Sequence, residues 1–173
     1  MVRSRKGVFP VNMERWIVAG SLLLSIISLK KLVPREKWRD AWILFLFLQV
    51  ITWPAGLFAV EMGWIEYPTQ LLPQANKYNK TSFSFEFFIF PIVAIFFSLY
   101  YPYKIKRLKA LLYYLCFAGF FTLLEVLLEK YTTLVEYHDW KWYWTLLTVM
   151  ISLFINHKYY FWFRKRLIKV KSL

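Results

Sequence analysis

The stretch ALLYYLCFAGFFTLLEVLL, residues 110–128, contains one charged side chain, Glu125, among apolar and aromatic residues. About 20 mostly apolar residues suffice for a helix to cross the hydrocarbon core of a bilayer. The whole chain of 173 residues is 59% hydrophobic and 22% aromatic. A soluble domain of this size has too little interior to bury that much apolar surface. The composition therefore predicts an all-α integral membrane protein that forms a single domain, 1–173.

Four further apolar runs resemble this one. Together the five runs predict transmembrane helices at about 14–32, 41–61, 85–102, 109–129 and 141–163. Pro54 and Pro91 lie inside the second and third runs, and membrane helices tolerate such prolines as kinks. Prolines and asparagines are frequent between these two runs, so residues 62–84 are expected to form an extracytoplasmic loop. We expect a polytopic membrane protein built as a bundle of five transmembrane helices.

The basic residues predict how this bundle is oriented. The first and third connections and the C-terminal segment are rich in lysine and arginine, whereas the second and fourth connections hold two lysines each. Such residues favour the cytoplasmic side of a membrane. The N-terminus is therefore expected outside and the C-terminus in the cytoplasm. Basic residues before Met13 conflict with this orientation, and a start at Met13 rather than Met1 largely removes the conflict.

The C-terminal segment HKYYFWFRKRLIKVKSL, residues 157–173, has aromatic residues followed by basic ones. We expect it to lie on anionic lipid headgroups, at about 1 kcal/mol per basic residue near the surface. The net charge of +13 could also suggest nucleic acid, but the basic residues form short clusters between apolar runs. That distribution is typical of membrane proteins and argues against nucleic-acid binding.

Most acidic residues lie on the predicted outer side. Glu86 and Glu125 lie about sixteen residues above the inner ends of their helices, about one turn inside the outer interface. Glu61 and Glu129 are expected nearer the headgroups. The acidic residues on this side are Glu61, Glu66, Glu86, Glu125, Glu129, Glu136 and Asp139.

Small and weakly polar residues mark one face of several helices. In the fourth helix, Ala118, Thr122, Glu125 and Glu129 follow one another in steps of four and three, so they share a face. The second and fifth helices carry similar stripes, and such stripes pack transmembrane helices together. These faces are expected to point into the bundle and to bring Glu86 towards Glu125.

Two interpretations of these carboxylates stay open at this point. In the structural one, Glu125 is protonated or hydrogen-bonded to Thr122, Tyr131 or His138, and Glu129 lies in the headgroup layer. In the functional one, an acidic site of Glu125, Glu86, Glu129 and Glu61 binds a cation, a proton or a basic partner. Two close carboxylates can share a proton, and hard divalent cations such as Ca²⁺ or Mg²⁺ take oxygen ligands. No other cofactor is expected.

Motifs for catalysis are scarce. His138 and His157 are predicted on opposite sides of the bilayer, and no GxSxG, P-loop, GxGxxG or HExxH motif occurs. The single cysteine, Cys116, excludes a disulfide within the chain. An intramembrane enzyme is therefore the weakest interpretation. A transport component and a structural or accessory subunit, which includes a homo-oligomer, are alternatives to the cation site.

Three segments carry a resemblance to a known family. They are MERWIVAGSLLLSIISL at 13–29, NKTSFSFEFFIFP at 79–91 and LLEVLLEKYTTLVEYHDWKWYWT at 123–145. From Met13 to about Phe163 the chain resembles an uncharacterised family of small multi-pass membrane proteins from spore-forming Bacillus-type bacteria. The resemblance implies a bacterial cell membrane and no assigned activity. The residues in these segments that could carry a shared role are Glu86, Glu125, Glu129, Tyr131 and Trp142.

Overall fold

The computed structural model describes residues 11–71, 82–102 and 104–171, and 79% of the structure is helical. Its main elements are α1 (Val11–Leu32), α2 (Trp38–Glu61), α4 (Phe90–Leu99), α5 (Arg107–Tyr131) and α6 (Trp142–Lys171). A short 3-10 helix, η1 (Arg35–Lys37), precedes α2, and a π-helix, η2 (Phe83–Ile89), continues directly into α4. The all-α prediction is confirmed. The helices begin and end within a few residues of the predicted bounds, except that α6 continues past residue 163.

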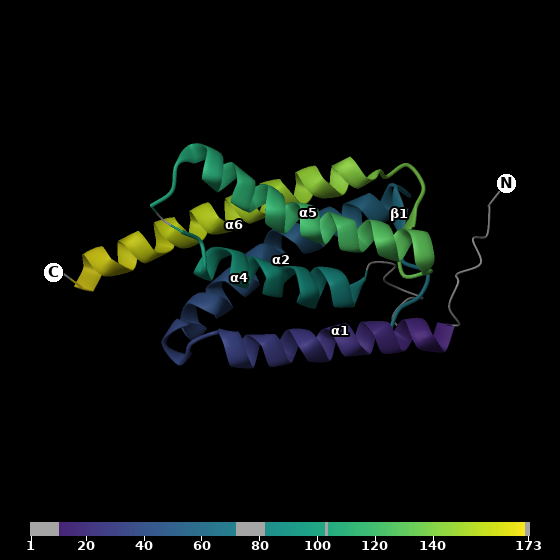
Figure 1. The fold of residues 1–173 in the computed structure, drawn as a ribbon, viewed down its shortest axis with the longest axis horizontal. Coiled ribbons are helices and arrows are strands. Elements are labelled where there is room, and N and C mark those ends of the chain that lie inside the picture. Colours follow the sequence, from purple (N-terminus) through teal and green to yellow (C-terminus); the bar gives the residue numbers. More distant parts are fainter. Residues whose placement is uncertain (1–10, 72–81, 103, 172–173) are drawn as a thin grey trace.

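Two short strands were not predicted from the sequence. β1 (Ile65–Glu66) pairs antiparallel with β2 (Glu136–Tyr137), with Ile65 opposite Tyr137 and Glu66 opposite Glu136. Strands of two residues are too short to show the alternating pattern by which a strand is recognised. The pairing joins the chain that follows α2 to the connection between α5 and α6, and so it closes one end of the bundle (Figure 1).

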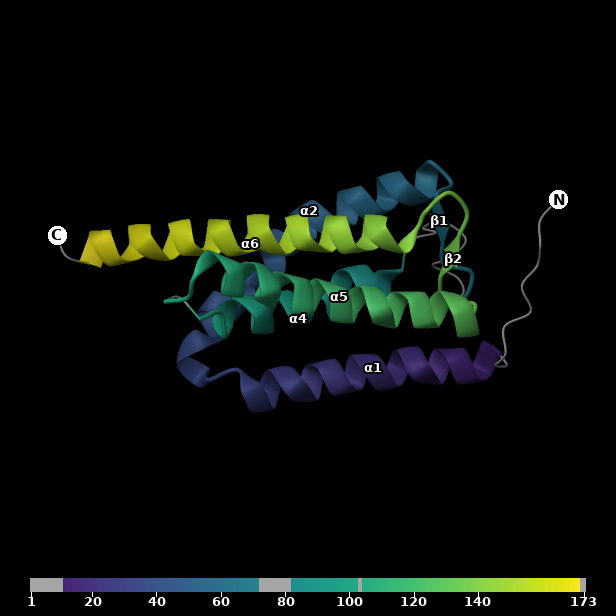
Figure 2. The same ribbon diagram turned by 45° about the horizontal axis from the view of Figure 1, so that its top comes forward.

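The helices run along the long axis of the molecule, and α4 lies among them (Figures 1 and 2). α4 is buried along most of its length, whereas α1 lies on one side of the bundle and packs mainly against η2. α1 begins at the end where β1 and β2 lie, and α6 ends at the opposite end. This end with the strands is called the sheet end below, and the other is called the basic end.

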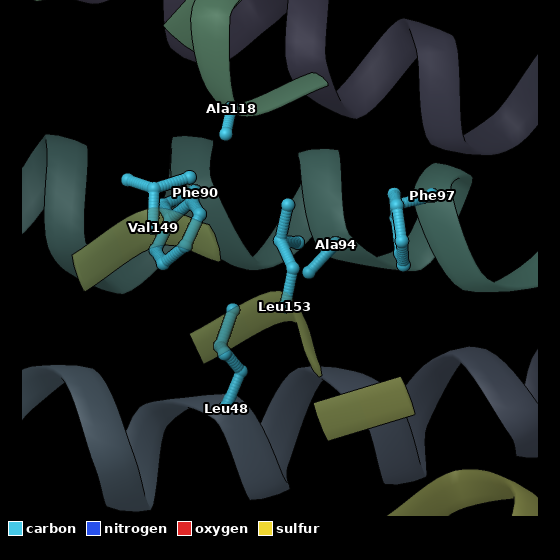
Figure 3. Packing of buried hydrophobic residues seen from close by; sticks show 7 residues of the cluster. All are labelled: Leu48, Phe90, Ala94, Phe97, Ala118, Val149 and Leu153. Carbon is cyan, nitrogen blue, oxygen red and sulfur yellow. The ribbon is translucent and has the colours of Figure 1, made fainter. Parts of the chain in front are cut away.

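An apolar cluster fills the middle of the bundle (Figure 3). Ala94 of α4 and Ala118 of α5 are fully buried in it, and their small side chains let the helices approach closely. The other buried members are Leu48 of α2, Phe90 and Phe97 of α4, and Val149 and Leu153 of α6. The cluster therefore joins four helices in one core.

The outer surface of the helices is apolar. Leu24, Val50 and Leu123, on three different helices, are 65%, 70% and 57% exposed. Within the described residues, two helical segments are long and apolar enough to cross a membrane, Arg35–Glu61 and Arg107–Tyr131. Only 22% and 11% of their apolar windows are buried, whereas a core helix of a soluble protein is mostly buried. The structure therefore indicates association with a membrane.

Candidate functional site

The acidic residues gather at the sheet end. Of the ten acidic residues in the chain, only Glu36 and Asp40 lie at the basic end (Figure 1). Asp40 accepts a hydrogen bond of 2.8 Å from the Tyr160 phenol and lies 3.8 Å from Arg164. The other eight acidic residues occupy the sheet end, where few basic side chains are described. The candidate site must be sought there.

The structure brings Glu86 and Glu125 together in one cavity of about 130 Å³. Glu86 comes from η2 and Glu125 from α5, and α2 and α6 complete the cavity. Its hydroxyl groups come from the small and polar faces recognised in the sequence, namely Thr52, Thr145, Thr148 and Ser152. Its aromatic walls are Tyr67, Phe85, Phe90, Phe121 and Trp140. Ala55 and Thr148 in the lining are exposed, so the cavity opens between α2 and α6.

Glu125 is held by donors from the strand pair and from α6. The Tyr137 phenol donates to its Oε1 over 2.5 Å, and the Thr145 hydroxyl donates to the same oxygen over 2.7 Å. The indole N–H of Trp140 donates to the Thr145 oxygen at 2.8 Å, which orients that hydroxyl. Glu125 is therefore the final acceptor in a short chain of hydrogen bonds that runs from Trp140 through Thr145.

The expected partners of Glu125 were wrong. Thr122 donates to the Ala118 carbonyl of its own helix at 2.8 Å, and Tyr131 lies exposed at the end of α5. His138 instead lies 3.3 Å from Glu66. The reason is the strand pair, because neighbouring side chains of an extended segment point to opposite sides. Tyr137 of β2 points to the helices, and the next residue, His138, points away from them.

Glu86 has fewer hydrogen-bond donors than Glu125. The Tyr67 phenol hydrogen-bonds to it, and its Oε2 is buried with no hydrogen-bond partner among the described residues. A methyl group placed on Gly56 would collide with this carboxylate, so glycine at that position leaves the space that Glu86 fills.

The backbone that carries Glu86 is fixed from two sides. The side-chain amide of Gln49 in α2 donates to the Phe87 carbonyl at 3.1 Å, and the Ser82 hydroxyl accepts from the Phe85 N–H at 3.3 Å. Segments of π-helix free carbonyl groups from the regular helical pattern and are frequent at functional sites. The Gln49 bond satisfies one carbonyl within η2 and connects α2 to the segment that carries Glu86.

Two tyrosines outside the helices act as donors to these acids. Burial raises the pKa of Tyr67 well above its usual range, and the negative charges of Glu86 and Glu125 raise it further. Burial also raises the pKa of Tyr137, and the nearby Glu125 adds to the effect. Both phenols therefore keep their protons at neutral pH and donate to the carboxylates.

The other two acids of the predicted site lie outside this cavity. Glu61 is exposed at the carboxyl end of α2, and Glu129 lies one turn beyond Glu125, half-buried. Neither lines the space between Glu86 and Glu125. The candidate site is therefore the pair Glu86 and Glu125, with Glu61 and Glu129 on the surrounding surface.

Sequence reasoning missed a further buried carboxylate. Glu14 in the first turn of α1 is 0% exposed, and its two oxygens accept from the backbone N–H of Thr133 at 2.7 Å and from the Thr133 hydroxyl at 2.5 Å. Thr69, which follows β1, also bonds to the Thr133 hydroxyl at 2.7 Å. Glu14 thus attaches α1 to the connection between α5 and α6. No local signal could reveal a contact across 119 residues.

The chemistry of the cavity is that of a small site for positive charge. Among the described residues, no group of three or more His, Cys, Asp or Glu side chains could hold a metal ion. Two close carboxylates can share one proton, and the single negative charge that remains is balanced by a singly charged ion. Comparison with known proteins finds no family model, no curated protein and no solved structure that matches the chain.

Proposed function

We propose that the chain is a non-enzymatic, multi-pass protein of a bacterial cell membrane, as the family that it resembles would be. All five helices cross the bilayer, α4 together with η2, with the N-terminus outside and the C-terminus in the cytoplasm. The less apolar helices α1 and α6 support this because no Asp, Glu, Lys or Arg occurs from Trp16 to Leu29 or from Trp142 to His157. The gathering of basic residues at one end of the bundle fits the cytoplasmic side.

Within this protein, the cavity at the sheet end binds a small monovalent cation between Glu86 and Glu125. The observation that carries this proposal is the buried Oε2 of Glu86, which has no hydrogen-bond partner among the described residues. A buried carboxylate without a partner costs several kcal/mol unless a cation or a proton neutralises it. A basic protein partner suits the site less well, because this oxygen lies inside the bundle.

The geometry supports binding at this site better than passage through the bundle. Phe90 and Val149 line the cavity and also belong to the apolar cluster in the middle of the bundle. The cavity therefore ends at that cluster on the side that faces the basic end. An ion would enter and leave at the sheet end, through a movement of the strand pair above the site.

The test measures the thermal unfolding midpoint of the purified full-length protein at constant ionic strength. Sodium or potassium replaces the bulky cation N-methylglucamine. An ion at a hundred times its dissociation constant adds about 2.7 kcal/mol of stability, which raises the midpoint measurably. We expect Glu86→Gln and Glu125→Gln each to abolish the increase, and the double variant to lose no more than either single variant.

Two control variants separate the cavity from the surrounding surface. Glu61→Gln and Glu129→Gln remove the same charge at the same end of the bundle, and we expect both to keep the cation-dependent increase. A wild-type midpoint that is the same in sodium, potassium and N-methylglucamine would refute cation binding. An equal loss in the control variants would assign the effect to general surface charge. If the unfolding midpoint responds to neither sodium nor potassium, but depends on pH in a way that is lost in Glu86→Gln and Glu125→Gln, the site binds a proton instead of a metal ion.

A further inference from the structure

A second concave site lies at the basic end, between α5 and α6. Its volume is about 690 Å³, several times that of the acidic cavity. Figure 1 shows α5 and α6 crossing, so that the start of α5 and the end of α6 lie apart at this end. Leu111 of α5 and Ile151 and Phe154 of α6 contribute apolar walls. Because these walls lie between helices rather than in a loop, the groove belongs to the fold itself.

The mouth of this groove is positively charged. Arg107 at the start of α5 and Lys158 near the end of α6 both line it. Lys158 lies over the Phe154 ring, 5.4 Å from the ring centre, so its aliphatic part follows the groove wall. Neither Arg107 nor Lys158 has an acidic partner within the part of the chain that the structure describes, and no acidic residue described there lines the groove.

Neither of the two acidic residues at this end, Glu36 and Asp40, lines the groove. Asp40 is already hydrogen-bonded to Tyr160 and lies beside Arg164. The amino end of α5 adds the positive end of a helix dipole near Arg107. An anionic group is therefore the ligand that complements this part of the surface.

The length of the groove indicates what continues below that anion. Below Lys158 the lining continues along α6 to Leu147, which is about 17 Å at a rise of 1.5 Å per residue. One leaflet of a bilayer has about 15 Å of hydrocarbon. The groove thus has a charged mouth and an apolar body long enough for an acyl chain. A soluble anion would leave this apolar body unfilled.

We propose that the groove binds one anionic phospholipid of the cytoplasmic leaflet. Its phosphate lies between Arg107 and Lys158, and one acyl chain lies against Leu111, Ile151 and Phe154. Basic pockets between transmembrane helices on this side of a membrane are suited to such headgroups. This site is independent of the cation cavity, which lies at the opposite end of the bundle. Its lining includes His157, Lys158 and Phe161 at the start of the C-terminal segment, whereas Arg164 and Lys165 further along do not line it.

The test counts the lipids that the purified full-length protein retains from mixed micelles of phosphatidylglycerol and phosphatidylcholine, by native mass spectrometry. A basic residue near an anionic surface contributes about 1 kcal/mol. If Arg107 and Lys158 each contribute this much, the protein prefers phosphatidylglycerol over phosphatidylcholine by roughly 30-fold. We expect the double variant Arg107→Gln/Lys158→Gln to lose this preference. The matched pair Lys109→Gln/Lys165→Gln removes two exposed basic groups at the same end, outside the groove, and should keep it.

A second pair of variants tests the apolar body without a change of charge. Ile151→Trp fills the groove and should lower the amount of retained phosphatidylglycerol, whereas Ile155→Trp on an exposed part of α6 outside the groove should not. Equal retention of the two lipids by the wild type would overturn the proposal. An equal loss of preference in Lys109→Gln/Lys165→Gln would also overturn it, because it would show a diffuse attraction to basic residues at this end.

Discussion

Gly56→Ala tests the geometry of the acidic cavity with one added methyl group. Gly56 lies inside α2, and a methyl group on it would overlap both oxygens of the Glu86 carboxylate. The carboxylate must then move within a largely buried site, away from its position beside Glu125. The substitution therefore acts on Glu86 without changing any charge.

Two opposing contributions decide how much Gly56→Ala changes the free energy of unfolding. Alanine is favoured over glycine inside a helix by about 0.8–1.0 kcal/mol. An extra methyl group in a packed site costs about 1–3 kcal/mol through displaced side chains. The net change is therefore expected between about zero and 2 kcal/mol of destabilisation. The sodium-dependent increase in the unfolding midpoint should fall at the same time, because one of the two carboxylates no longer faces the ion.

Gly119→Ala is the matched control. Gly119 lies inside α5, and a methyl group there would meet nothing within 4 Å. We expect this variant to gain up to about 1 kcal/mol of stability from helix propensity alone and to keep the sodium effect. The measurement is the free energy of unfolding of each purified variant, with and without sodium.

A double-variant cycle identifies the contact that is responsible. Gly56→Ala in a Glu86→Ala background has no carboxylate to displace, so it should stabilise the protein as Gly119→Ala does. The reasoning fails if Gly56→Ala alone is as stabilising as Gly119→Ala and leaves the sodium effect intact. That result would show that the carboxylate of Glu86 lies elsewhere.

Three further predictions concern the rest of the molecule. Glu14→Ala leaves the N–H and hydroxyl of Thr133 without their acceptor, so proteolysis of the purified protein should cut near α1 faster, at a stability cost of about 1–3 kcal/mol. Because its folded-state pKa is raised, Tyr137 contributes stability that is complete below about pH 10 and is lost at higher pH. Tyr137→Phe should therefore weaken the alkaline fall of the unfolding midpoint, and an unchanged fall would contradict this. With the native cysteine replaced, a cysteine at the exposed residue Asp139 should react with an impermeant maleimide in intact cells, and one at Lys37 only after lysis. The opposite labelling pattern would reverse the proposed orientation.

Hydropathy was enough to locate the helices, because each apolar run is long and bounded by charged or loop-forming residues. The small and polar faces also indicated which sides of the helices approach one another, and through them the proximity of Glu86 to Glu125. Those faces are a local property, repeated every three or four residues, so a single sequence displays them. The bond from Gln49 to a carbonyl of η2 had no such periodic signal.

The partners of Glu125 depended on contacts that no periodicity records. Tyr137 is placed by a strand of two residues whose other half lies about seventy residues earlier in the chain. His138, its neighbour, offered the more familiar partner for a carboxylate, and the sequence could not show that the two residues face opposite ways. Glu14 was overlooked for a related reason, since a glutamate in the first turn of a helix usually needs no partner beyond the helix dipole.

The strand pair separates the environment of Glu86 and Glu125 from that of Glu66 and Glu136. Ile65 and Tyr67 are two residues apart in an extended segment, so they point to the same side, and Tyr137 lies opposite Ile65 on that side. This inner side places both phenols against the carboxylates.

The outer side of the same strand pair carries Glu66 opposite Glu136, and like charges in such positions repel. His138 lies 3.3 Å from Glu66 and offsets part of that repulsion when it is protonated. The strand pair is thus both the cover of the cavity and the source of its hydrogen-bond donors. A change that separates β1 from β2 would therefore release Glu86 and Glu125 together, because both carboxylates depend on donors held by the same short ladder.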